Sequence, residues 1–296
     1  MKKSRLIICI MLSALCMATT GCNKHDDDGG GDGGGIWNST IIEGSLPGLF
    51  SVSDDQQVYF SQGNLQYQAS TNTWRFAEHQ WDYVGENNKY ISSTYDGWID
   101  LFGWGTSGYN NMNPYMASTS YSQYCYMMSS ISGTMYDWGV YNSISNGSNQ
   151  VGTWRTLRGY EWIYLMNSRQ TASGIRYAKA KVNGVNGVII LPDNWNSNSY
   201  SLNNTNEIEA EFASNVIEES AWQRTFDSKG AVFLPASGKR HGATIYNVGN
   251  RGNYWSTTSP DNDDANGLVF DNVSLDTKGW DDKDYGWSVR LVCPAN

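Results

Sequence analysis

Side chains that form hydrogen bonds and stack on rings are concentrated late in the chain, in residues 261–287. Carboxylates and amides bond to hydroxyl or peptide groups, and Trp and Tyr rings stack on sugars or apolar side chains. Such a mixture is typical of a surface that binds a protein or a glycan. The candidate ligand-binding residues are Asp261, Asn262, Asp263, Asp264, Asn266, Asp271, Trp280, Asp282, Asp284, Tyr285 and Trp287.

The carboxylates of this segment also suggest calcium binding or glycoside hydrolysis. Asp261, Asp263 and Asp264 match half of an oxygen-ligand loop, but Ala265 stands where another ligand is needed and no Glu closes the loop. Acid pairs suited to glycoside hydrolysis arise by chance in a segment this rich in Asp. We therefore expect no catalytic metal, and calcium only in a structural role.

No other part of the chain indicates catalysis. His25, His79 and His241 are isolated, and neither H-E-x-x-H nor G-x-S-x-G occurs. Residues 103–108 have the spacing of a dinucleotide-binding glycine motif, but the Asn-rich stretch that follows cannot open the helix that would hold the pyrophosphate. We expect neither an enzyme nor an organic cofactor.

A frame of apolar residues holds this late polar segment. Leu268, Phe270, Val273 and Leu275 fit two short strands of period 2, with a turn at Asp271 and Asn272. The flanking residues 252–258 and 288–293 are rich in apolar side chains and are predicted to lie in the core. Fixed apolar anchors are therefore expected to carry a polar and aromatic surface.

Earlier segments predict an antiparallel framework with long loops. Alternation of apolar and polar residues predicts strands over 48–53, 57–67 and 74–77. Residues 80–108 are rich in aromatics and Gly and are predicted to be loops. An Asn183-Gly184 turn between apolar runs predicts a hairpin that spans 176–191.

Two helices are expected in this framework. Helical spacing of apolar residues predicts an amphipathic helix over 159–168. A second helical region is predicted over 207–227, weakest around Ser214 and Asn215, with Gly230 as its C-terminal cap. A buried strand over 230–235 should follow.

Composition and charge favour one secreted domain. With 40% hydrophobic residues, 13 Trp, 19 Tyr and 31 Gly, the chain suits a turn-rich domain that contains β-structure better than a helical bundle. The formal net charge is −9, and it becomes −12 once the three cations Lys2, Lys3 and Arg5 are removed with the leader. Nucleic acid is therefore excluded as a partner.

The N-terminus indicates export and a lipid anchor. A basic start, an apolar run over 6–15 and the sequence A-T-T-G-C ending at Cys22 resemble a bacterial lipoprotein signal over 1–21. An ordinary secretory peptide cut nearby is the alternative. Residues 22–35 are acidic and Gly-rich, which predicts a flexible tether before one folded domain over 36–296.

The cysteine count leaves one question open. Cys22 is the lipidation site, and Cys125 and Cys293 remain after cleavage. In an oxidising compartment these two either pair or stay free, and the sequence does not distinguish the two states.

Five motifs carry a resemblance to a known family. In order, they are W-R-T-L-x-x-x-E-W at 154–162, G-V-I-I-L-P at 187–192, G-A-V-F-L-P-A-S-G at 230–238, N-Y-W-S-T-T at 253–258 and S-V-R-L-V at 288–292. The set resembles the domain named for the major paralogous proteins of Fibrobacter succinogenes. One departure is Arg158, which replaces the usual Ser or Thr, so the capping box should be missing and Thr156 is expected to cap the helix.

The resemblance implies an α+β domain with a C-type-lectin-like fold, with antiparallel strands, two helices, long aromatic and Gly-rich loops, and N- and C-terminal strands paired at one pole. It also implies a surface lipoprotein of Bacteroidetes, held in the outer leaflet of the outer membrane, whose C-terminal segment can be a target of a diversity-generating retroelement. The copper site of formylglycine-generating relatives is not carried over, because Cys125 and Cys293 lack matching surroundings.

Two functions follow from these observations. The first is a cell-surface module, anchored through Cys22 and monomeric, that binds an extracellular protein or glycan through residues 261–287. The second is a structural or adhesin-type subunit of a surface assembly that binds no small ligand. Co-purification with other outer-membrane proteins would favour the second.

Overall fold

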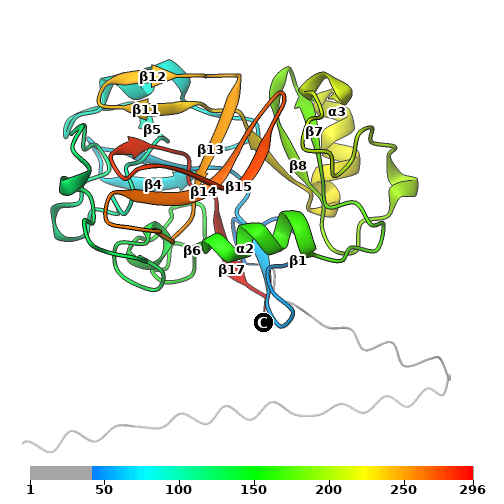
Figure 1. Cartoon of the computed structure of the whole chain (residues 1–296), viewed down its shortest axis with the longest axis horizontal. Helices are drawn as coiled ribbons and strands as arrows, with labels where there is room; N and C mark the ends of the chain where they lie inside the picture. The colour runs from blue at the N-terminus through cyan, green and yellow to red at the C-terminus, as the bar shows by residue number, and fades with distance from the viewer. Residues whose placement is uncertain (1–41, 296) are drawn as a thin grey trace, which may run out of the picture. The chain divides into compact units, whose positions relative to one another are not determined.

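The computed structural model describes residues 42–295, and these belong to one compact unit, Ser39–Asn296. Its strands form small sheets in which almost all neighbouring strands are antiparallel (Figure 1), so the prediction of an α+β domain is confirmed. The predicted lipidation site Cys22 and the predicted tether over 22–35 lie outside the described residues. The strands are β1 (Phe50–Ser51), β2 (Gln57–Phe60), β3 (Leu65–Gln68), β4 (Thr73–Phe76), β5 (Trp98–Ile99), β6 (Arg155–Thr156), β7 (Tyr177–Val182), β8 (Val185–Ile190), β9 (Val216–Ile217), β10 (Val232–Pro235), β11 (Lys239–His241), β12 (Thr244–Tyr246), β13 (Arg251–Trp255), β14 (Asp264–Asp271), β15 (Leu275–Asp282), β16 (Tyr285–Gly286) and β17 (Leu291–Pro294).

Helical structure is short and lies between the strands. None of the helices within residues 42–295 is long and apolar enough to cross a bilayer. The helices are α1 (Trp138–Tyr141), α2 (Gly159–Ile163) and α3 (Glu219–Ala221), the π-helical turns η4 (Tyr164–Ser168) and η7 (Trp222–Phe226), and the 3₁₀ turns η1 (Gly85–Tyr90), η2 (Tyr109–Asn111), η3 (Tyr121–Gln123), η5 (Ser197–Ser199), η6 (Phe212–Ser214) and η8 (Asp227–Lys229).

The helix predicted over 159–168 is confirmed as α2 continued by η4. Its cap differs from the prediction: Arg158 is the N-cap, and its backbone N–H donates to the Glu161 carboxylate at 2.7 Å. Thr156 lies in β6, where its hydroxyl donates to Asp137, so the prediction that Thr156 caps the helix is wrong. The Glu161 half of a capping box thus forms without Ser or Thr at the N-cap.

The second helical region is shorter than predicted. Residues 219–229 are helical in three short pieces, and Gly230 follows with a positive φ of 74°, which confirms the cap. The part before Glu219 does not form the predicted helix. It holds only the 3₁₀ turn η6, which leads into β9, and β9 pairs in parallel with β7. The side-chain amide of Asn215 donates to the backbone carbonyls of Lys179 and Asn203, and these bonds favour the extended form.

The hairpin predicted from Asn183-Gly184 is confirmed. β7 and β8 pair in antiparallel register, and the two turn residues have φ of 47° and 81°, as a type I′ turn requires. The predicted strand over 230–235 is confirmed as β10, which pairs with β8.

The three-stranded sheet β13-β14-β15 lies in the middle of the molecule, with α2 against it (Figure 1). Leu268, Phe270 and Leu275 are buried in the same core cluster as Trp162 of α2, as predicted for apolar anchors. Val273 does not share this role, since it is 64% exposed. It lies in the turn between β14 and β15, where the Asp271 carboxylate accepts hydrogen bonds from the N–H groups of Val273 and Ser274, so its prediction as an anchor is wrong.

The two ends of the domain meet in one sheet. β17 pairs with β2, with Val292 opposite Phe60, and also with β6. This is the pairing of terminal strands that the family resemblance implies. Cys125 and Cys293 are both buried free thiols, and burial raises the pKa of each to about 12.

Candidate ligand-binding surface

The β14–β15 hairpin carries an exposed tryptophan among polar side chains. Trp280 is 62% exposed, and Asn266 lies opposite it in the antiparallel register. Next along the hairpin, Asp264 lies opposite Asp282. Cross-strand partners at such positions have neighbouring side chains, so one large ring and several hydrogen-bonding groups share one end of the hairpin.

Asp264 and Asp282 form a carboxyl pair. Partial burial, followed by the hydrogen bond to Asp282, raises the pKa of Asp264 to about 6. Like charges on neighbouring strands favour sharing of a proton. The pair therefore presents both a hydroxyl donor and carboxylate acceptors in weakly acid solution.

The loop before β14 is shaped by its own acids. The Asp261 carboxylate accepts hydrogen bonds from the backbone N–H groups of Asp264 at 2.8 Å and Asp263 at 3.0 Å, and these bonds lower the pKa of Asp261. Within residues 42–295, no three His, Cys, Asp or Glu side chains form a group that could hold a metal ion. Structural calcium binding stays a prediction. The hydrogen bonds described here hold the loop without an ion.

A buried ammonium group holds this loop in place. Lys283 is fully buried, and its Nζ donates to the carbonyls of Asn262 at 2.8 Å, Met128 at 3.1 Å and Asp261 at 3.2 Å. The same Nζ lies 4.9 Å from the centre of the Trp104 ring. This role could not be predicted from the sequence, because the residues D-D-K-D at 281–284 are typical of a solvated turn.

Two predicted contact residues are buried, and their prediction as exposed groups is wrong. The Trp287 ring stacks on Trp255 with the ring centres 4.0 Å apart, and its Nε1–H donates to Asp281 at 2.9 Å. Asp284 is 1% exposed, and its Oδ2 lies 3.5 Å from Nε2 of His241. Because packing removes Trp287 and Asp284 from solvent, these two residues stabilise the surface from below and do not contact a ligand.

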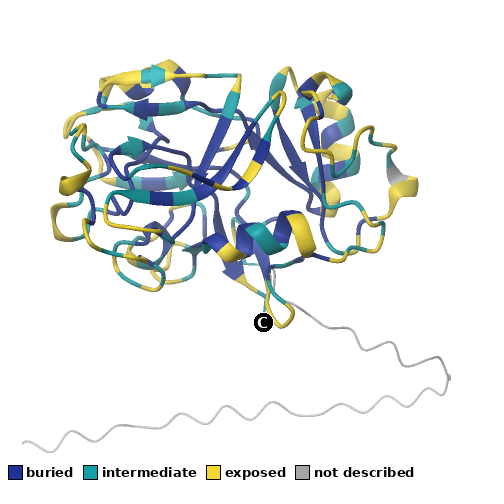
Figure 2. Ribbon diagram, viewed as in Figure 1, coloured by how far each residue is buried: buried dark blue, intermediate teal, exposed yellow. Residues whose placement is uncertain are grey.

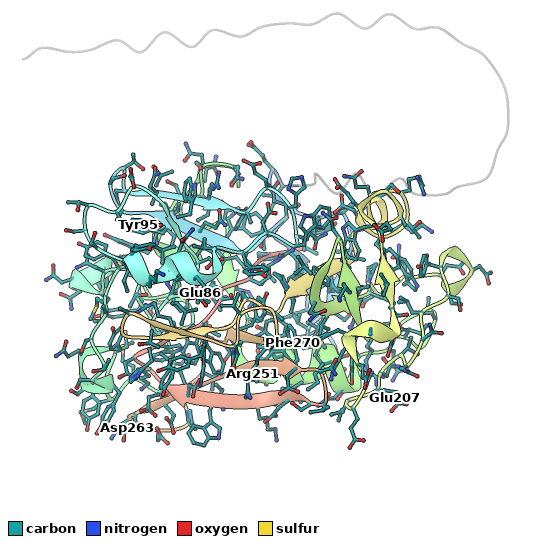
Figure 3. The ribbon with its side chains drawn as sticks, turned by 90° about the horizontal axis from the view of Figure 1, so that it is seen from above. Glu86, Tyr95, Glu207, Arg251, Asp263 and Phe270 are labelled. Carbon is teal, nitrogen blue, oxygen red and sulfur yellow. The ribbon has the colours of Figure 1, made fainter. Side chains whose placement is uncertain are left out.

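The other predicted residues divide into two groups by position. Tyr285 is half-buried, stacked on His241 with Lys239 over its ring. Asp271 is the last residue of β14 and lies opposite Arg251, and Figure 3 shows Arg251 well away from Asp263. The structure therefore gathers one set of candidates at the end of the hairpin: Asp261, Asn262, Asp263, Asp264, Asn266, Trp280 and Asp282.

Comparison of the chain with protein-family models, with curated proteins and with solved structures found no match.

Proposed function

We propose that the protein is a cell-surface lipoprotein whose C-type-lectin-like domain binds an extracellular protein or glycan through the end of the β14–β15 hairpin. The observation that carries the proposal is the exposure of Trp280, at 62%, beside hydrogen-bonding groups whose backbone is fixed. A large ring left in solvent by a well-packed sheet costs hydrophobic free energy, which binding can recover.

The fold part of the proposal is supported by three features. The terminal strands β2 and β17 pair, α2 packs against the central sheet, and a long aromatic and Gly-rich stretch separates β4 from β6. These are the features that the family resemblance implies for a C-type-lectin-like domain. They are compatible with retroelement diversification of the segment between Leu268 and Arg290.

Lipidation of Cys22 would hold the domain at the outer membrane through residues 22–35. We expect a Cys22→Ser variant to leave the membrane fraction and to lose incorporation of a fatty-acid analogue. Wild-type protein is the control for both readouts. A variant that still fractionates with the outer membrane would contradict the lipid anchor.

Replacing Trp280 with alanine should weaken binding at least tenfold, because the ring supplies most of the exposed apolar area of this surface. The full-length chain in detergent is assayed on a glycan array and against a phage-displayed library of random peptides. Tyr90→Ala is the matched control, since Tyr90 is 56% exposed on η1. Equal binding by both variants would place the binding site away from Trp280. No binding by the wild type would favour a structural subunit of a surface assembly.

A further inference from the structure

A long uncharged stretch lies next to the candidate surface. Residues 101–136 contain no Asp, Glu, Lys, Arg or His, although 17% of the whole chain is charged. The stretch is instead rich in Tyr, Met, Ser and Asn, the residues that paratopes use for adaptable contacts. Its composition is visible in the sequence, but its location is not.

Four large apolar or aromatic side chains of this stretch stand in solvent. Met127 is 71% exposed, Met135 52%, Tyr126 44% and Tyr121 38%. The Tyr121 and Tyr126 rings lie 6.1 Å apart and form a pair at the surface. We call these four residues the Tyr/Met patch. Figure 2 shows the loops of this side of the molecule as mainly exposed and intermediate residues.

The backbone beneath the patch is held in a fixed and strained form. Cys125 and Met127 have positive φ angles of 42° and 63°, which non-glycine residues rarely adopt. Buried anchors hold this form: the Tyr124 hydroxyl donates to the Ser118 carbonyl at 3.0 Å, and Ile131 is fully buried. In this backbone form the side chains of Tyr126 and Met127 are exposed to solvent.

Hydrogen bonds join residues 128–131, which directly follow Tyr126 and Met127, to the segment before β14. The N–H of Ser259 donates to the Ser129 carbonyl, and the N–H of Ile131 donates to the Thr257 carbonyl, each at 2.9 Å. The ammonium of Lys283 bonds to carbonyls on both sides, at Met128 and at Asn262. The stretch that carries the Tyr/Met patch is therefore fixed to the acidic loop before β14.

We infer that the Tyr/Met patch binds a protein partner through an apolar surface area that has Lys or Arg on one side, and that it acts together with the proposed hairpin surface. Thioethers and phenol rings pack well against apolar side chains, and the flexible methionine side chains can adapt to the shape of a protein surface. The adjacent Asp261 and Asp263 attract cations to one edge, in line with the net charge of −9. A second copy of the chain fits less well, since a dimer would bring two acidic loops to one interface.

This inference rests on the proposed function and is tested with the same probe, a phage-displayed library of random peptides panned on the full-length chain. Selected peptides should combine apolar residues with Lys or Arg. They should bind a Tyr126→Ser/Met127→Ser variant at least tenfold more weakly than wild type. A Met135→Ser variant, which keeps the strained turn intact, should show a weaker loss in the same direction. The matched control is Ile208→Ser/Val216→Ser, because Ile208 and Val216 are 53% and 57% exposed elsewhere on the chain.

Three results would overturn the inference. Selected peptides that bind both double variants equally but fail on Trp280→Ala would leave the proposed function standing and remove the patch from it. Glycan binding that is lost in the Tyr126→Ser/Met127→Ser variant would show the wrong class of partner. Self-association in analytical ultracentrifugation that the patch variant abolishes would identify a second copy of the chain as the occupant.

Discussion

We expect replacement of Glu161 with alanine to lower the free energy of unfolding by about 3 kcal/mol. This is the lower end of the cost of breaking a buried ion pair. Glu161 is fully buried, and its carboxylate accepts two hydrogen bonds from the Arg155 guanidinium, at 2.7 and 2.8 Å. It also accepts the N–H of Arg158 at the start of α2. The cost stays at the lower end because Arg155 keeps 20% of its side-chain surface exposed and can hydrate.

Thermal unfolding measures this loss. For a domain of this size, about 3 kcal/mol corresponds to a fall in Tm of roughly 6–12 °C. Glu219→Ala is the matched control, since Glu219 opens the short helix α3 from an exposed position. We expect its Tm to change by only about 1–2 °C. A fall of less than about 3 °C in the Glu161 variant would mean that the pair contributes little to folding.

The sequence predicted the hairpin better than it predicted which rings face solvent. The period-2 pattern from Leu268 to Leu275 is local, and it predicted two strands joined by a turn, although it placed Val273 in the second strand and missed the length of both. Trp280 and Trp287 each follow a glycine, so their local sequences look alike. Tertiary contacts bury Trp287, among them the stacking of Trp255 and the bridge to Phe102, and such contacts leave no mark on the neighbouring residues.

The predictions for the helix before Glu219 and for Asp284 were wrong for a similar reason, because distant contacts decide the structure of these polar residues. Residues 207–218 have helical composition, but side-chain bonds from Asn215 to two other segments stabilise an extended form. Asp284 and Lys283 stand among acids that suggest a solvated turn, yet both are buried. Their burial depends on acceptors and charges that arrive from distant parts of the chain, such as the Met128 carbonyl and His241.

The burial of Lys283 leads to the second large prediction. In a Lys283→Met variant the carbonyls of Met128, Asp261 and Asn262 lose their common donor, and methionine supplies no replacement. A buried carbonyl left without a donor costs about 1–3 kcal/mol. These three carbonyls are only partly buried, the Asp261 carbonyl keeps the Ser259 hydroxyl as a donor, and the loop can open to water, so the total is far below three full penalties. We therefore expect a loss of about 2–3 kcal/mol in the free energy of unfolding and local opening of the loop before β14.

Amide hydrogen exchange separates this local opening from global destabilisation. The N–H groups of Ser259 and Lys283, bonded to the Ser129 and Asp263 carbonyls, should exchange at least tenfold faster in the Lys283→Met variant, while β7 and β8 keep their protection. Lys278→Met is the control, because Lys278 is exposed on β15, the strand that ends just before Lys283, and it should leave both regions unchanged. Exchange that rises equally everywhere would show that Lys283 stabilises the whole core and not the loop alone.

Repeating the wild-type measurement with calcium and with EDTA tests the structural ion. Since the Lys283 ammonium already binds the converging carbonyls, we expect identical protection of the loop in both conditions.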